Sequence, residues 1–97
     1  MRKNYILNAF SLQMIKEKNY SVKVSEIETL PAGLESAVGH ADTAAVLGVE
    51  CNRINITLEA GDVVYVAQLQ GGRLPEGATK LPEGFSFKFL RVEVFSA

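Results

Sequence analysis

Hydrophobic and polar residues alternate, or apolar residues run together, over much of the chain, and both patterns are typical of β-strands. Residues 5–10 form a largely apolar run that predicts a buried strand. Residues 21–27 and 52–58 alternate in polarity, so each predicts a strand with one buried face. Residues 63–67 are continuously apolar, which suits a central strand covered on both faces. The last predicted strand spans residues 85–95.

Two details of this pattern predict how the strands connect and pack. The short turn 59–62 contains Gly61, which tolerates positive φ, and therefore predicts a hairpin between strands 52–58 and 63–67. In the last strand the apolar positions change from odd to even numbers near residues 89–90. Either a β-bulge explains this change, or one face packs on the core and the other on a partner chain.

Two short helices are predicted between these strands. Ser11 is a favoured N-cap residue, and the residues after it suit a helix to about Lys18. Helix-forming residues follow Gly39, and Gly48 is a natural C-terminal stop. His40 then lies at or just before the first turn of the second helix.

The order of these elements predicts the fold class. Residues 28–35 and the glycine-rich segment 70–77 are predicted to be connections. Strands interleaved with short helices are typical of an α/β protein. We therefore expect a single small domain over residues 1–97, with a mixed five-stranded sheet and short flanking helices. A chain of 97 residues buries only a moderate share of its surface, so dimerisation would add stability.

Composition narrows the classes of partner. Ten basic residues nearly balance eleven acidic ones, whereas proteins that coat long nucleic acid have a basic excess, so we expect no DNA partner. A small anionic ligand needs only a few placed donors and stays compatible with the net charge of −1. Without a polybasic run or a long apolar stretch, we expect no membrane partner. The first apolar run ends at Asn8, which is too short for a signal peptide, so a cytoplasmic protein is expected.

Cysteine and metal-ligand spacing exclude further classes of site. Cys51 is the only cysteine, so no disulfide forms within the chain and a reducing compartment is expected. It follows an apolar stretch, which predicts a small buried thiol. One histidine, one cysteine and scattered carboxylates have no ligand spacing, so neither a metal nor another cofactor is predicted.

His40 is the residue whose setting points most directly to chemistry. A histidine at a helix start lies near unpaired N–H groups that attract a phosphate. Beside a phosphate, an imidazole can donate a proton to a leaving oxygen at neutral pH. A surface role is equally compatible with the residues alone, and Asp42 or Thr43 could simply cap the helix. From the residues alone, a structural role and a catalytic role are about equally compatible with His40.

Other polar residues are open to the same two interpretations. Arg53 lies on the polar face of a predicted strand, and Arg73 and Glu76 lie in the glycine-rich loop, where solvated charges are common. Gln68 could be a strand end. Asn8 stands out more, because an amide at the end of a buried strand needs hydrogen-bond partners. Ser11 is an N-cap residue that could also contact a ligand.

Five segments in order carry a resemblance to a known family. They are Asn8-Ala9-Phe10-Ser11, Gly39-His40-Ala41-Asp42-Thr43, Asn52-Arg53-Ile54-Asn55-Ile56-Thr57-Leu58, Gln68 and Arg73-Leu74-Pro75-Glu76-Gly77. With them the chain resembles the viral ring nucleases, the type III anti-CRISPR proteins once classed as a domain of unknown function in archaeal viruses, phages and integrative elements. Each segment alone is weak, and the order of all five is fairly specific.

The resemblance implies a homodimer that binds cyclic tetra-adenylate and cuts it, without metal, into linear di-adenylates with a 2′,3′-cyclic phosphate. It implies that His40 is the general acid and that Glu76 assists it. Arg73 would close over the ligand and Arg53 would add a second basic contact. The other ligand-binding positions that it implies are Asn8, Ser11, Thr43 and Gln68. A protein of this kind would act in the cytoplasm of the host cell if it is viral.

Two other functions fit the same residues. The pocket could sequester a cyclic nucleotide as a sponge without cutting it, or the chain could be a regulatory protein of a mobile genetic element. A sponge would need the arginines but not the histidine. The presence of His40, Arg73 and Glu76 together therefore favours the nuclease.

Overall fold

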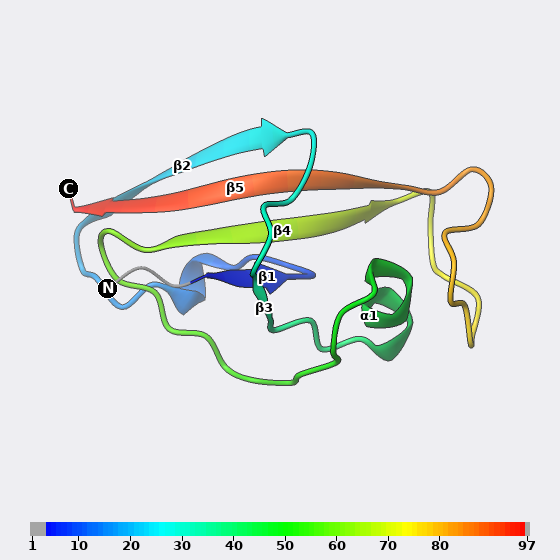
Figure 1. Ribbon diagram of the computed structural model, residues 1–97. Coiled ribbons are helices and arrows are strands. Elements are labelled where there is room, and N and C mark those ends of the chain that lie inside the picture. The colour runs from blue at the N-terminus through cyan, green and yellow to red at the C-terminus, as the bar shows by residue number, and fades with distance from the viewer. Residues whose placement is uncertain (1–3, 97) are drawn as a thin grey trace.

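The computed structural model describes residues 4–96, in which five strands form one mixed sheet (Figure 1). In chain order the elements are β1 (Tyr5–Leu7), a 3₁₀ helix η1 (Leu12–Met14), β2 (Tyr20–Ile27), β3 (Glu35–Ser36), α1 (Ala41–Leu47), β4 (Val63–Gln70) and β5 (Ser86–Ser96). The strand order across the sheet is β2-β5-β4-β1-β3. β5 pairs antiparallel with β2 and β4, and β1 pairs parallel with β4 and β3. The predicted mixed five-stranded sheet is confirmed, with one α-helix and one 3₁₀ helix beside it.

The central position of β4 follows from its apolar run. Val64 and Val66 lie on one face of the sheet and Val63 and Ala67 on the other, and all four are buried. A strand that is apolar at both odd and even positions must be covered on both faces. We call the side of Val64 and Val66 the core face and the opposite side the helix face, because Leu69 on that side contacts the same pocket as α1.

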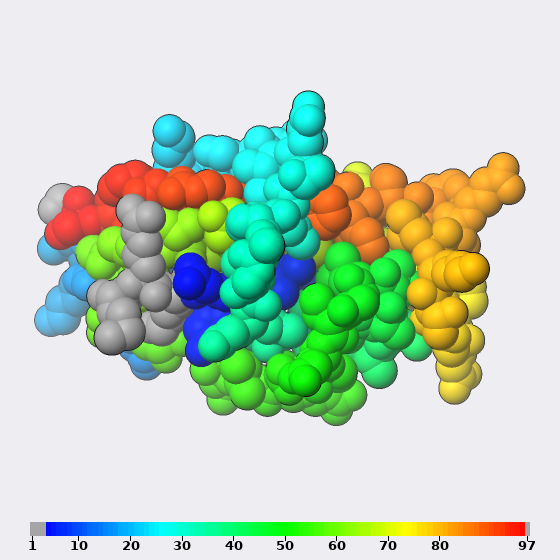
Figure 2. All heavy atoms as spheres, in the orientation of Figure 1, coloured from blue at the N-terminus to red at the C-terminus, as the bar shows by residue number. Residues whose placement is uncertain are grey.

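The two faces are covered by different parts of the chain. On the core face, a buried cluster packs against the segment around η1; it comprises Leu7, Ile15, Ala37, Leu58, Val64, Val66, Val92 and Val94. On the helix face, α1 and the connection from β2 to β3 lie over the sheet, as the green and cyan segments of Figure 2 show. Each fully buried valine side chain contributes about 1.5–3 kcal/mol relative to an exposed one.

The phase change in β5 comes from these two faces and not from a bulge. β5 pairs with β4 in an unbroken register from Val63↔Glu93 to Gln70↔Ser86, so the predicted bulge is wrong. Val92 and Val94 face the buried cluster, whereas Phe87 and Phe89 point to the helix face. The apolar pattern changes because different ends of the strand bury different faces.

Residues 52–58 do not form the predicted strand, and the hairpin predicted with them is absent as well. Within the part that the structure describes, this stretch makes only an isolated bridge between Leu58 and Ile15. The fifth strand is instead β3, inside the predicted connection 28–35 and its continuation. Alternating polarity indicates that one side of a segment is buried, as Leu58 is. It does not show that the backbone pairs with a neighbouring strand of the sheet.

The helix predicted after Ser11 is also shorter than expected. Ser11 does cap it, since its hydroxyl accepts a hydrogen bond from the N–H of Gln13 at 3.2 Å. The helix stops after Met14 because Ile15 turns into the core with 8% of its surface exposed and adopts an extended backbone. By contrast, α1 ends as predicted at Gly48, which has φ +74°.

Cys51 is exposed, so the prediction of a buried thiol is wrong. The apolar stretch before it lies at the end of α1 and just beyond it, and Glu50 and Asn52 on either side of Cys51 then hydrogen-bond to the edge strand β3. Hydrophobic neighbours in sequence therefore do not place this thiol in the core.

A charged group lies on the helix face of β5. Arg91 Nη1 donates a hydrogen bond to Glu93 Oε1 at 2.7 Å, and both side chains are half-buried. This hydrogen bond raises the pKa of Arg91 above its ordinary value; burial acts in the opposite direction, and Tyr65 adds to the rise. The guanidinium is therefore held in the charged form beside its carboxylate.

Asp62 anchors the turn that leads into β4, and its removal is expected to destabilise the fold. Its side chain is 2% exposed, and Oδ2 accepts a hydrogen bond from the Glu59 N–H at 2.9 Å. Asp62→Ala leaves that donor without this acceptor, so we expect the free energy of unfolding to fall by about 1–3 kcal/mol. Urea denaturation followed by circular dichroism measures this. Asp62→Asn keeps an acceptor oxygen and should lose clearly less; equal losses would contradict the role of this hydrogen bond.

Candidate functional site

His40 stands at the start of α1 with its imidazole accessible. It is the N-cap residue, with φ −106° and ψ 121°, and its side chain makes no capping hydrogen bond. The residue is exposed. Because α1 has only seven residues, the helix end by itself is too short to make an anion site. Any ligand must be held by groups from other elements around His40.

Two of the predicted site residues hold the peptide that precedes His40. The N–H of Gly39 donates to Asn8 Oδ1 at 3.3 Å, and the carbonyl oxygen of Gly39 accepts from Arg53 Nε at 3.0 Å. Asn8 directly follows β1, and Arg53 comes from the extended segment after α1. The amide and the guanidinium therefore fix the entry of the chain into α1 from both sides.

A pocket of about 330 Å³ brings together three further predicted residues. It is lined by His40, Asp42, Thr43, Leu69, Arg73 and Leu74. The start of α1 supplies the imidazole and the Thr43 hydroxyl, and the loop after β4 supplies the guanidinium of Arg73. This combination offers an acid, a hydroxyl and a cation to one ligand group.

The loop between β4 and β5 is attached to the start of α1. The N–H of Gly77 donates to Asp42 Oδ1 at 3.3 Å. This contact engages one oxygen of the carboxylate that lines the pocket. It also brings the exposed residue Glu76 to the same end of the molecule, although Glu76 does not line the pocket. Residues 70–77 were predicted to be a loop, and beyond Gln70, the last residue of β4, they are one.

Ser11 and Gln68 lie apart from this group. Ser11 lines a separate pocket of about 350 Å³ between η1 and residues 54–57. Gln68 is exposed opposite Lys88, and strand alternation places its side chain on the core face, away from Leu69. One chain thus gathers Asn8, Arg53 and the pocket residues around His40 but leaves these two elsewhere.

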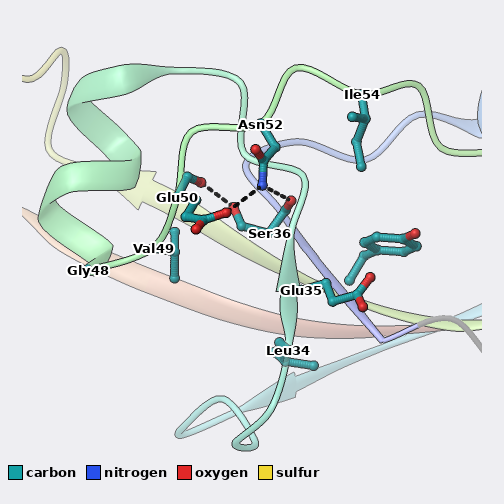
Figure 3. A pocket seen from close by; sticks show the side chains of 9 residues that line it. Leu34, Glu35, Ser36, Gly48, Val49, Glu50, Asn52 and Ile54 are labelled. Atoms are coloured by element: carbon teal, nitrogen blue, oxygen red, sulfur yellow. Dashed lines mark hydrogen bonds between the residues drawn. The ribbon is translucent and has the colours of Figure 1, made fainter.

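A cavity of about 640 Å³, larger than the pocket of His40, lies in another part of the molecule (Figure 3). It lies beside the edge strand β3, where Asn52 Nδ2 donates to the carbonyl oxygen of Ser36 at 3.1 Å and Ser36 Oγ donates to the carbonyl oxygen of Glu50 at 2.7 Å. These bonds cover the outer edge of the sheet. The sequence pattern missed this network, because Ser36 lay between the predicted connection and the predicted helix, and Asn52 lay in a predicted strand.

Within residues 4–96, no three His, Cys, Asp or Glu side chains gather as a metal site. None of the helices in this part of the chain has the length and apolar composition needed to cross a membrane.

Comparisons with known proteins give the following. Residues 4–86 match the model of the STIV B116-like family. Among solved structures, the chain is similar to B116 of Sulfolobus turreted icosahedral virus (STIV), with a TM-score of 0.74 and 20% sequence identity over 94% of this chain and 98% of that one. At this identity the likeness concerns the fold. No curated protein matches the chain.

Proposed function

This chain belongs to the STIV B116-like family, and on that premise we propose that it is a metal-independent ring nuclease. Its substrate is cyclic tetra-adenylate, and its products are linear di-adenylates that end in a 2′,3′-cyclic phosphate. Loss of this messenger suppresses type III CRISPR immunity. The ligand and the reaction come from the family resemblance of the sequence, and the geometry around His40 supports them.

The observation that carries the proposal is that side chains from several different elements lie around His40. Its imidazole shares a pocket with Thr43 and Arg73, which come from different elements. Asn8 and Arg53 hold the preceding peptide through Gly39. A solvated surface histidine would need neither a neighbouring cation nor a fixed backbone.

The chemistry needs little from the protein beyond position and a proton. The ribose 2′-hydroxyl attacks the adjacent phosphorus, and the bond from phosphorus to the 5′-oxygen breaks. His40 in its protonated form gives its proton to the departing 5′-oxygen, and the 2′-hydroxyl proton leaves to water. Arg73 balances the charge that develops on the phosphoryl oxygens, while Glu76 assists from the loop. The nucleophile belongs to the RNA itself, so no metal is required.

The proposal includes a homodimer. A pocket of about 330 Å³ is at the small end for a drug-sized ligand, and a ring of four nucleotides is larger than that. A two-fold axis would place two such pockets against a ring that has its own symmetry. It would also let Ser11 and Gln68, which lie away from His40 in one chain, reach the ligand bound mainly by the other copy.

Incubation with cyclic tetra-adenylate and EDTA, followed by mass analysis, tests the proposal. We expect di-adenylate with a 2′,3′-cyclic phosphate and no effect of EDTA. A ring methylated at every 2′-oxygen is the matched control, because it lacks the nucleophile and should bind without being cut. Cleavage of the methylated ring, or strong inhibition by EDTA, would contradict the mechanism. Binding of the natural ring without any cleavage would identify a sponge instead.

A further inference from the structure

An aromatic pair lies on the helix face beside the pocket of His40. Phe87 and Phe89 are stacked, with ring centroids 6.1 Å apart and 16° between their planes. Neither side chain is buried. In Figure 2 the orange spheres around the start of β5 and the green spheres of α1 are visible on the same side of the molecule. The last stretch of chain, from residue 87 on, lies beyond the segment that matches the family model.

The register places Phe87 directly beside this pocket. Phe87 pairs with Leu69 of β4, and Leu69 lines the pocket with His40 and Arg73. Residues opposite each other in an antiparallel pair have Cβ atoms about 4.5–5.5 Å apart on one face. The aromatic ring is therefore one side chain away from the groups that would hold a phosphate.

On its other side, Phe87 has no paired strand within the described residues. The pairing of β2 with β5 ends at Ile27↔Phe89, so at Phe87 the strand is paired with β4 alone. Phe89 is flanked by Ile27 on that side, and Arg91 beyond it is engaged with Glu93. Phe87 is thus a partly exposed ring at the end of this face, with Phe89 stacked against it.

We propose that Phe87, backed by Phe89, is a stacking platform for an adenine base of the ring, a proposal that rests on the proposed function. A nucleotide combines an anionic phosphate with a flat apolar base. The site offers a cation, Arg73, and a partly exposed aromatic ring close to each other, which complements both parts. Proteins bind unpaired bases by stacking them on aromatic side chains. Stacking at Phe87 would fix the base while His40 and Arg73 act on the phosphate.

Binding of the 2′-O-methylated cyclic tetra-adenylate, measured by calorimetry, tests the platform. Phe87→Leu keeps an apolar side chain without a ring and should weaken binding by about 5- to 100-fold. Phe87→Tyr keeps the ring and should bind within about twofold of the wild type. Phe95→Leu is the matched control, because Phe95 lies on the same face at the far end of β5 and is 39% exposed; it should bind as the wild type does. A ring with one adenine replaced by 2-aminopurine gives a second readout, since stacking on Phe87 should quench its fluorescence.

The outcomes separate the two proposals. If the wild type binds the ring and Phe87→Leu binds equally well, the platform is overturned and the proposed function stands. If the wild type does not bind at all, both are overturned. This face could instead contact a second copy of the chain, and sedimentation of each variant measures the oligomeric state that tests this. If Phe87→Leu converts a dimer to a monomer, the platform is overturned and the face is a contact between copies.

Discussion

His40→Ala should bind cyclic tetra-adenylate as tightly as the wild type but cut it at least about 100-fold more slowly. The imidazole is exposed and caps nothing, so its loss removes a proton donor without removing a structural contact. Arg73 and Thr43 still line the pocket, which is why binding should persist. Single-turnover cleavage and a gel shift with the same ring measure the two properties separately.

The controls for His40→Ala follow from its exposure. Surface substitutions of this kind change the free energy of unfolding by less than about 0.5 kcal/mol, so denaturation curves should overlay those of the wild type. Cleavage at the wild-type rate by the variant would remove His40 from the mechanism. A loss of binding equal to the loss of cleavage would make it a ligand contact only.

The sheet could be predicted where apolar residues bury both faces. Residues 63–67 predicted the central strand correctly, because only a strand covered on both sides is apolar at odd and even positions. The end of α1 was equally clear, since Gly48 supplies the left-handed backbone that stops a helix. These signals are local, and each has one physical cause.

The sequence pattern gave wrong predictions of strands at two segments. Residues 52–58 alternate because Leu58 and Ile56 turn toward the core, yet their backbone joins no ladder in the described part of the chain. β3 shows the reverse case: two residues next to Pro31 and Gly33 carry no alternation, and they pair with β1 because the connection brings them there. Pairing of this kind depends on the path of the chain in space, which a window of sequence does not contain.

The sequence names candidate site residues one by one but does not show how they are arranged. The resemblance supplied Asn8 and Arg53 as ligand contacts, whereas the structure shows each bonded to Gly39. In one chain they act as positioning groups for the residue after it. Asp42, which the sequence marked only as a capping residue, holds the Gly77 end of the loop. Such contacts join residues more than a dozen positions apart, so no local pattern announces them.

Gly71 lies at the start of the loop that carries Arg73, and the surroundings of Gly71 leave no room for a side chain. It has φ +111°, and a Cβ added there would lie 2.7 Å from the carbonyl oxygen of Gly84 and 3.0 Å from Cα of Phe85. Both contacts are with backbone, which cannot rotate away as a side chain can. The two ends of the loop between β4 and β5 therefore approach each other closely at Gly71. The neighbouring Gly72 has φ +119° but open space where its Cβ would be.

Gly71→Ala should therefore destabilise the fold much more than Gly72→Ala. Both substitutions force an L-residue into the left-handed region, which costs about 1–2 kcal/mol. Only Gly71→Ala adds a clash with backbone, and we expect a further 1–3 kcal/mol, roughly as for an overpacked core. Because the clash separates the two ends of the loop, Arg73 moves relative to His40, and cleavage should fall even at temperatures where the variant is fully folded. Thermal denaturation and single-turnover cleavage at low temperature measure the two effects. Equal stability of the two variants would show that the close approach of Gly71 to Gly84 does not hold the loop.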